Sequence, residues 1–93
     1  MKKLTEDQIQ EHLSGIDNWE YSDDAIHTTI EFNDFKDCFA VMTRIAFEAE
    51  GMGHHPDWNN VYNTLSITLS THDAGGLTEK DFKLAKIIDA LIS

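Results

Sequence analysis

The stretch NDFKDCFAVMTRIAFEAEG, residues 33–51, decides the fold of this chain. Its apolar side chains recur at the three- and four-residue spacing that places side chains on one face of an α-helix; they are Phe35, Phe39, Met42, Ile45, Ala46 and Ala49. Asn33 or Asp34 can cap its start, and Gly51 stands just past its last apolar residue, as glycine often does at helix ends. The sequence therefore predicts a long central helix with Glu50 at its C-terminal end.

On the N-terminal side of this helix, the period changes to that of a β-strand. From Trp19 to Phe32 apolar and polar residues alternate, with Ser22-Asp23-Asp24 as a turn signal, and this pattern predicts a β-hairpin. Before the hairpin, Thr5-Glu6-Asp7-Gln8 has the form of a capping box, which predicts a first helix of about 10 residues.

On the C-terminal side, GMGHHPDWNN (residues 51–60) contains two glycines and a proline, which predict no regular structure. Val61-Tyr62 then indicates a short strand, and residues 65–70 alternate between apolar and hydroxyl side chains as a second strand would. Thr78 can cap a last helix, whose predicted apolar face consists of Phe82, Ala85, Ile88, Leu91 and Ile92.

These elements predict the order αββαββα. The expected fold class is α+β, a two-layer sandwich in which a four-stranded antiparallel sheet carries its helices on one face. A chain of 93 residues has room for one hydrophobic core, so residues 1–93 are expected to form a single domain.

The charge of the chain excludes some functions. Seventeen acidic and seven basic side chains give a formal net charge of −10, which repels the phosphates of nucleic acids and anionic lipid surfaces. No apolar run approaches the roughly 20 residues that span a bilayer. We therefore expect a cytoplasmic protein without nucleic-acid or membrane partners, in which the one cysteine, Cys38, is a core residue.

Three histidines are the strongest candidates for chemistry. His54 and His55 lie in the loop with Gly and Pro, and His72 lies where a strand is predicted to end. Pro56 restricts the backbone of His55 and stiffens the loop. Because imidazole titrates near neutral pH, several imidazoles together can supply both an acid and a base, so the cluster indicates proton transfer.

Other residues near these histidines allow two interpretations. Glu50 and Asp81 can orient imidazoles or bind amino groups of a flat heterocycle, but they can equally be a helix-end charge and a capping residue. Trp58 and Tyr62 can form an apolar wall or belong to the core. A metal site stays open as an alternative, although the adjacent histidines lack the spacing of His-Glu-x-x-His.

The order Glu50, His54-His55-Pro56, Tyr62, His72 and Asp81 resembles the signature of the pterin-4a-carbinolamine dehydratases. The similarity extends from Leu4 to Ile88. It includes Asn18-Trp19-Glu20, Met42-Thr43-Arg44, Ala49-Glu50, His55-Pro56-x-Trp58, Asn60-Val61-Tyr62-Asn63 and Ile67-Thr68-Leu69-Ser70-Thr71-His72.

The resemblance implies a hydro-lyase that dehydrates 4a-hydroxytetrahydropterin to quinonoid dihydropterin, which recycles the pterin cofactor of aromatic amino-acid hydroxylases. It implies no metal and no cofactor. The implied catalytic residues are His54, His55 and His72: His54 and His72 share the acid and base roles, with no assignment between them, and His55 binds and polarises the substrate hydroxyl. Asp81 is implied to support the histidines. The residues implied to line the pterin pocket are Glu50, Trp58, Ser70 and Thr71.

The resemblance also implies partners and one departure. Relatives form homodimers or homotetramers, and a functional link to an aromatic amino-acid hydroxylase is expected. Animal relatives also serve as a dimerisation partner of a homeodomain transcription factor, so a protein-binding module is the alternative function. Where animal members usually have an acidic residue before the paired histidines, this chain has Gly53, so one pterin contact is expected to be absent or replaced.

Overall fold

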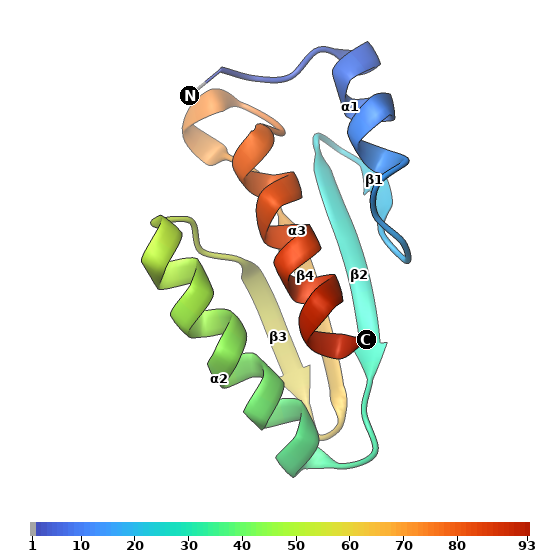
Figure 1. Ribbon diagram of the computed structural model, residues 1–93, viewed down its shortest axis with the longest axis vertical. Helices are drawn as coiled ribbons and strands as arrows, with labels where there is room; N and C mark the ends of the chain where they lie inside the picture. Colours follow the sequence, from blue (N-terminus) through green and yellow to red (C-terminus); the bar gives the residue numbers. More distant parts are fainter. Residues whose placement is uncertain (1) are drawn as a thin grey trace.

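The computed structural model describes residues 2–93 and combines α-helices with one antiparallel sheet (Figure 1). The elements, in chain order, are α1 (Glu6–Leu13), β1 (Glu20–Ser22), β2 (Ala25–Glu31), α2 (Phe35–Met52), β3 (Asp57–Val61), β4 (Thr64–Leu69), the 3-10 helix η1 (His72–Ala74) and α3 (Glu79–Ile92). The predicted α+β class and the order αββαββα are confirmed.

The sheet has the strand order β1-β2-β4-β3, with every neighbouring pair antiparallel. Figure 1 shows α2 and α3 lying across one face of this sheet, with α1 at the end of β1 and β2. Leu65, Ile67 and Leu69 of β4 point into the core and are at most 1% exposed, whereas Ser66 and Thr68 face the uncovered side. The strand period thus sorts apolar and polar side chains onto opposite faces, as predicted.

The N-terminal elements form as their local sequence predicts. The Thr5 hydroxyl accepts a hydrogen bond from the Gln8 amide at 3.2 Å, and the Gln8 side chain accepts one from the Thr5 amide at 2.8 Å. Asp23 and Asp24 both have positive φ, 53° and 59°, which is the backbone of the two-residue turn that suits a twisted hairpin.

The buried face of helix α2 overlaps the predicted one only in part. Its buried residues are Cys38, Ile45 and Ala49, whereas Phe35 and Phe39 are 44% and 54% exposed. At 100° per residue the buried three share one line along the helix, and the two phenylalanines lie on its flank. There their rings stack on each other with centroids 5.5 Å apart. The predicted stripe is therefore confirmed at Ile45 and Ala49, which are buried, and wrong at Phe35, Phe39 and Ala46, which are exposed.

Two predicted boundaries were also wrong. Helix α2 continues through Gly51 and ends at Met52; the next residue, Gly53, caps it with a left-handed backbone (φ 65°), and its N–H bonds to the carbonyls of Ala49 and Glu50. The irregular loop is short, because β3 already begins at Asp57. Polar residues such as Asn59 disfavour strands in isolation, but hydrogen bonding to β4 overrides this preference.

The core lies between the sheet and helices α2 and α3. Phe82, Leu84, Ala85 and Ile88 of α3 are each at most 1% exposed and pack with the apolar residues of β4 and α2. Cys38 is fully buried as predicted, and this burial raises the pKa of its thiol. Within residues 2–93, no helix combines the length and apolar character needed to cross a membrane.

Candidate active site

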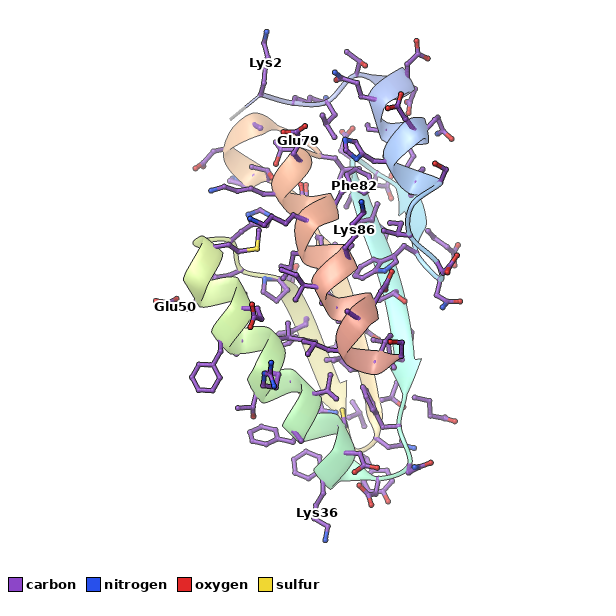
Figure 2. The ribbon with its side chains drawn as sticks, in the orientation of Figure 1. Lys2, Lys36, Glu50, Glu79, Phe82 and Lys86 are labelled. Carbon is purple, nitrogen blue, oxygen red and sulfur yellow. The ribbon has the colours of Figure 1, made fainter. Side chains whose placement is uncertain are left out.

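The candidate site forms where the C-terminal end of α2 meets the first turn of α3. Gly53 reverses the chain after α2, and the amide of His54 then donates a hydrogen bond to the carbonyl of Ala49 at 3.0 Å. This turn leaves His54 buried and directs its ring towards α3, while His55 and Glu50 remain on the surface. Figure 2 shows Glu50 projecting away from the body of the protein.

His54 and Asp81 form a buried pair. Nε2 of His54 lies 2.5 Å from Oδ1 of Asp81, and the side chains are 11% and 0% exposed. The other carboxylate oxygen, Oδ2, accepts hydrogen bonds from the Thr71 hydroxyl at 2.8 Å and from the Thr78 amide at 2.9 Å. Asp81 is therefore held on both oxygens, and it fixes the orientation of the imidazole.

The pair also determines which nitrogen of His54 can meet a substrate. An ionised carboxylate only accepts hydrogen bonds, so Nε2 carries a proton and faces Asp81. Among residues 2–93, every fully buried side-chain nitrogen or oxygen has a hydrogen-bond partner, and Nδ1 of His54 has none. Nδ1 is therefore not fully buried, and it is the ring nitrogen without a protein partner in the described part of the chain.

His55 and Glu50 form a second pair with a different environment. Nε2 of His55 lies 2.8 Å from Oε1 of Glu50, but the side chains are 64% and 79% exposed. Water competes for both groups at such exposure, so this contact orients His55 only weakly.

His72 is the third imidazole and makes no side-chain hydrogen bond within residues 2–93. It begins the 3-10 helix η1, which lies in a short loop closed by a hydrogen bond from the amide of Thr71 to the carbonyl of Gly76 at 2.9 Å. Its ring is exposed and free to meet a ligand. His72 is also next to Thr71, which contacts Asp81 directly.

The hydroxyl groups implied to line the pterin pocket already have protein partners. The hydroxyl of Thr71 lies 2.7 Å from that of Thr78, in addition to its bond to Asp81. The hydroxyl of Ser70 donates to the carbonyl of Asp24 at 3.0 Å. Thr78, considered from the sequence only as a helix cap, thus belongs to the network around Asp81. The three-residue spacing from Thr78 to Asp81, which is that of a capping box, was the sequence signal that could have indicated this contact.

The two candidate aromatic residues lie apart. Trp58 is half-buried, faces the helices and packs against the core. Tyr62 is 63% exposed and lies in the turn at the far end of β3 from Pro56. They therefore do not form one continuous wall.

The residues that the sequence grouped as one cluster are two separate pairs and a free histidine. Within the described part of the chain, no three side chains of His, Cys, Asp or Glu are arranged as a metal ion requires. The other two histidines, His12 and His27, are half-buried: His12 stacks on Phe82, and Nδ1 of His27 lies 3.0 Å from the Thr68 hydroxyl.

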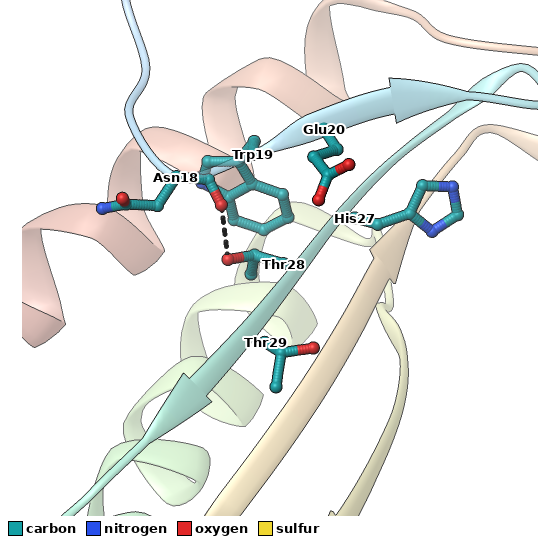
Figure 3. A pocket seen from close by; sticks show the side chains of 6 residues that line it. All are labelled: Asn18, Trp19, Glu20, His27, Thr28 and Thr29. Carbon is teal, nitrogen blue, oxygen red and sulfur yellow. Dashed lines mark hydrogen bonds between the residues drawn. The ribbon is translucent and has the colours of Figure 1, made fainter.

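A hollow of about 400 Å³ lies elsewhere, between the segment Asn18–Glu20 and β2 (Figure 3). Its walls include Trp19, His27 and Thr29, and the hydroxyl of Thr28 donates to the carbonyl of Asn18 at 2.7 Å. None of the three candidate histidines borders it, so it is not part of the candidate site.

Comparison with known proteins identifies relatives over almost the whole chain. The family model described as pterin 4 alpha carbinolamine dehydratase matches residues 2–91. A protein of Christiangramia forsetii with the assigned name pterin-4-alpha-carbinolamine dehydratase is 56% identical over 92 residues, which cover 99% of this chain and 95% of the relative. A Chelativorans protein with the same assigned name is 48% identical and covers 96% and 93%.

Solved structures agree with these matches. A crystal structure described as a transcriptional coactivator/pterin dehydratase from Brucella melitensis superposes with a TM-score of 0.96 at 38% identity, covering 99% of this chain and 100% of the other. A pterin dehydratase-like protein, described as a RuBisCO assembly factor in the alpha-carboxysome, has a TM-score of 0.66 at 23% identity and covers 78% and 84%. The latter shares the fold alone.

Proposed function

The chain belongs to the pterin-4a-carbinolamine dehydratase family, and we propose that it converts 4a-hydroxytetrahydropterin to quinonoid dihydropterin and water by metal-free proton transfer between histidines. In this reaction the bond from C4a to the hydroxyl oxygen breaks, N5 loses its proton, and a C4a–N5 double bond forms. The observation that carries the proposal is the buried His54–Asp81 pair, with Nδ1 of His54 left free.

His54 is the base in this proposal. Its Nδ1 accepts the proton from N5 of the pterin, and the imidazolium that forms is stabilised by the Asp81 carboxylate at 2.5 Å. Because Asp81 is itself held by Thr71 and Thr78, the imidazole needs little reorganisation during the transfer.

His72 is the acid that protonates the departing hydroxyl. Its ring has no competing hydrogen bond in the described residues, and the closed η1 loop holds it next to Thr71, which contacts Asp81. His55, oriented by Glu50, binds and polarises the same hydroxyl. Neither role needs burial, because both groups act on an oxygen that leaves as water.

Glu50, Trp58, Ser70 and Thr71 are proposed to line the pterin pocket. Since the hydroxyls of Ser70 and Thr71 already bond within the protein, these two residues would meet the ligand through their backbone groups. Backbone donors and acceptors suit the flat edge of a pterin, which carries both.

We also propose a homo-oligomer that recycles the pterin of an aromatic amino-acid hydroxylase. The exposed side of α2 carries Phe35 and Phe39 on its flank and Phe47 further round, the last of them 69% exposed, and large apolar side chains are costly in contact with water. A second copy of the chain would bury these rings.

A second candidate function is a protein-binding module, because the same phenylalanine face could receive another protein. The Brucella melitensis structure is described as a transcriptional coactivator/pterin dehydratase, and this description is the reason to test for a protein-binding function. Phe39→Ser with Phe47→Ser should dissociate a partner or a second copy, seen by sedimentation. Dehydration that persists in the dissociated protein would separate the two functions.

The test of the enzyme is turnover of synthetic 4a-hydroxytetrahydropterin by chelator-treated protein, compared with buffer alone because the substrate also dehydrates unaided. We expect acceleration by the wild type and its loss in His54→Ala and His72→Ala. Turnover no faster than buffer, or no loss in either variant, contradicts the mechanism. Activity that disappears on chelation and returns with zinc would support a metal site instead.

A further inference from the structure

The basic side chains of this acidic protein are unevenly placed. Of its seven lysines and arginines, five belong to the segment before α1 or to α3; they are Lys2, Lys3, Lys80, Lys83 and Lys86. Figure 2 shows Lys2 and Lys86 near the same end of the molecule as Glu79, far from Lys36. A chain with a net charge of −10 thus carries a local concentration of positive charge around the start of α3.

Two of these lysines have structural tasks. Nζ of Lys3 lies 3.9 Å from Oδ1 of Asp24, and the Lys3 side chain passes so close to Gly76 that a Cβ there would be 2.7 Å from Cε. Lys86 lies over the C-terminal end of α1, with Nζ 3.8 Å from the position of a Cβ on Gly15. An ammonium group at that end is favoured by the helix dipole.

Lys80 and Lys83 have no such task. Both line a hollow of about 400 Å³, together with Met52 and Glu79. Within residues 2–93, no carboxylate oxygen lies within 4.0 Å of either ammonium nitrogen. Two ammonium groups and one carboxylate therefore border a hollow that is otherwise lined by a thioether, and the balance of charge there is positive.

The hollow adjoins the elements that form the candidate site. Met52 is the last residue of α2, two positions before His54, and Lys80 directly precedes Asp81. Since His54 and Asp81 are in contact, the hollow is bordered by the same helix ends that hold the catalytic pair.

We propose that Lys80 and Lys83 bind an anionic group, a phosphate or carboxylate, at the end of the pterin side chain. This inference rests on the proposed dehydratase function and names its substrate class. The pterin ring is uncharged and needs no lysine. An anionic tail, by contrast, would be repelled by the chain as a whole and requires a local pair of cations. Lysine suits this task, because its ammonium group binds phosphate as a compact charge.

The test compares two 4a-hydroxytetrahydropterins, one with a neutral dihydroxypropyl side chain and one with its phosphate ester. For the wild type we expect kcat/KM to be about tenfold higher for the phosphate ester, the effect of one charge-assisted hydrogen bond. In K80Q/K83Q this ratio should fall close to one, and 0.5 M NaCl should reduce it in the wild type. K36Q/R44Q, which removes the same charge from α2 and leaves the lysines near the start of α3 in place, should keep the wild-type ratio.

A ratio of one in the wild type, or an unchanged ratio in K80Q/K83Q, overturns the inference. A second measurement separates it from the dehydratase proposal: binding of the two corresponding 7,8-dihydropterins, which cannot be dehydrated, followed by tryptophan fluorescence. If neither substrate is turned over but the phosphate ester binds more tightly in a manner that needs Lys80 and Lys83, the enzyme proposal fails and the anion site stands. If the substrates are turned over but the two dihydropterins bind equally well, the anion site fails and the dehydratase proposal stands.

Discussion

His54 and His55 are neighbours in the chain, and each contacts a carboxylate, yet their environments are opposite. The His54–Asp81 pair is 11% and 0% exposed at 2.5 Å, whereas the His55–Glu50 pair is 64% and 79% exposed at 2.8 Å. The left-handed turn at Gly53 produces this difference, because it sends one ring inward and leaves the next one outside.

The difference teaches that burial, and not residue type, separates the roles of two adjacent imidazoles. A buried carboxylate polarises and orients its histidine without competition from water, while an exposed one contributes little. His54 is thereby suited to proton transfer, and His55 to binding. The following changes test this contrast, beginning with the largest expected effect.

Replacing Asp81 by Asn should have the largest effect. The amide cannot stabilise an imidazolium, so we expect kcat to fall by about 10²- to 10⁴-fold. Loss of the buried charge partner should also lower the free energy of unfolding by about 3 kcal/mol. Turnover and urea denaturation measure the two effects. Asp7→Asn, in the exposed first turn of α1, is the control, and equal kcat in the two variants would refute the role of the pair.

Replacing Thr71 by Val should have a smaller effect of the same kind. Valine keeps the shape but removes the hydroxyl donor to Oδ2 of Asp81, which leaves a buried acceptor with one bond fewer. We expect about 1–2 kcal/mol of lost stability and roughly a tenfold lower kcat. Thr29→Val makes the same change on the uncovered face of the sheet, where it should leave kcat unchanged.

Replacing Glu50 by Gln should mainly weaken substrate binding. With His55 less firmly oriented, KM should rise about threefold, and stability should change by less than about 1 kcal/mol because the pair is exposed. Steady-state kinetics of this variant and of Glu48→Gln on the same helix provide the comparison. A collapse of kcat in Glu50→Gln alone would mean that the exposed pair takes part in proton transfer.

The smallest effect concerns salt. Raising NaCl from 0.1 to about 1 M should shift the ring ¹⁵N resonances of His55, because the ions screen its contact with Glu50, and leave those of His54 nearly unchanged. The same NMR spectra report whether Nε2 of His54 carries a proton. A spectrum in which Nδ1 is protonated and Nε2 is bare would contradict the proposed orientation of the base.

Local signals in the sequence predicted most of the fold. The capping box at Thr5, the turn at Asp23-Asp24 and the alternation in β4 each depend on residues close together in the chain, and all three are confirmed. The family and its enzyme class, a hydro-lyase, were also predicted correctly from the resemblance.

The errors concern features that arise from packing between distant segments. The buried face of α2 depends on where the sheet and α3 lie, and β3 forms because β4 is there to pair with it. The same holds for the site. His54 and Asp81 are 27 positions apart, so the resemblance implied their contact, but their spacing in the sequence could not predict it. Which carboxylate each histidine contacts depends on the direction of its side chain, and the sequence does not give that direction.

Asp81 also caps α3. It is the third residue of this helix, and its carboxylate accepts a hydrogen bond from the amide of the N-cap residue Thr78 at 2.9 Å. Helix ends can fray, but Thr78 and Asp81 are both fully buried, which holds this end closed. Each fraying event at this end would release Asp81 from Thr78 and with it the support of His54. Hydrogen exchange of a single backbone amide, that of Thr78, would then count the molecules with an assembled site. Opening of this one helical turn should therefore abolish activity even while the rest of the fold stays intact.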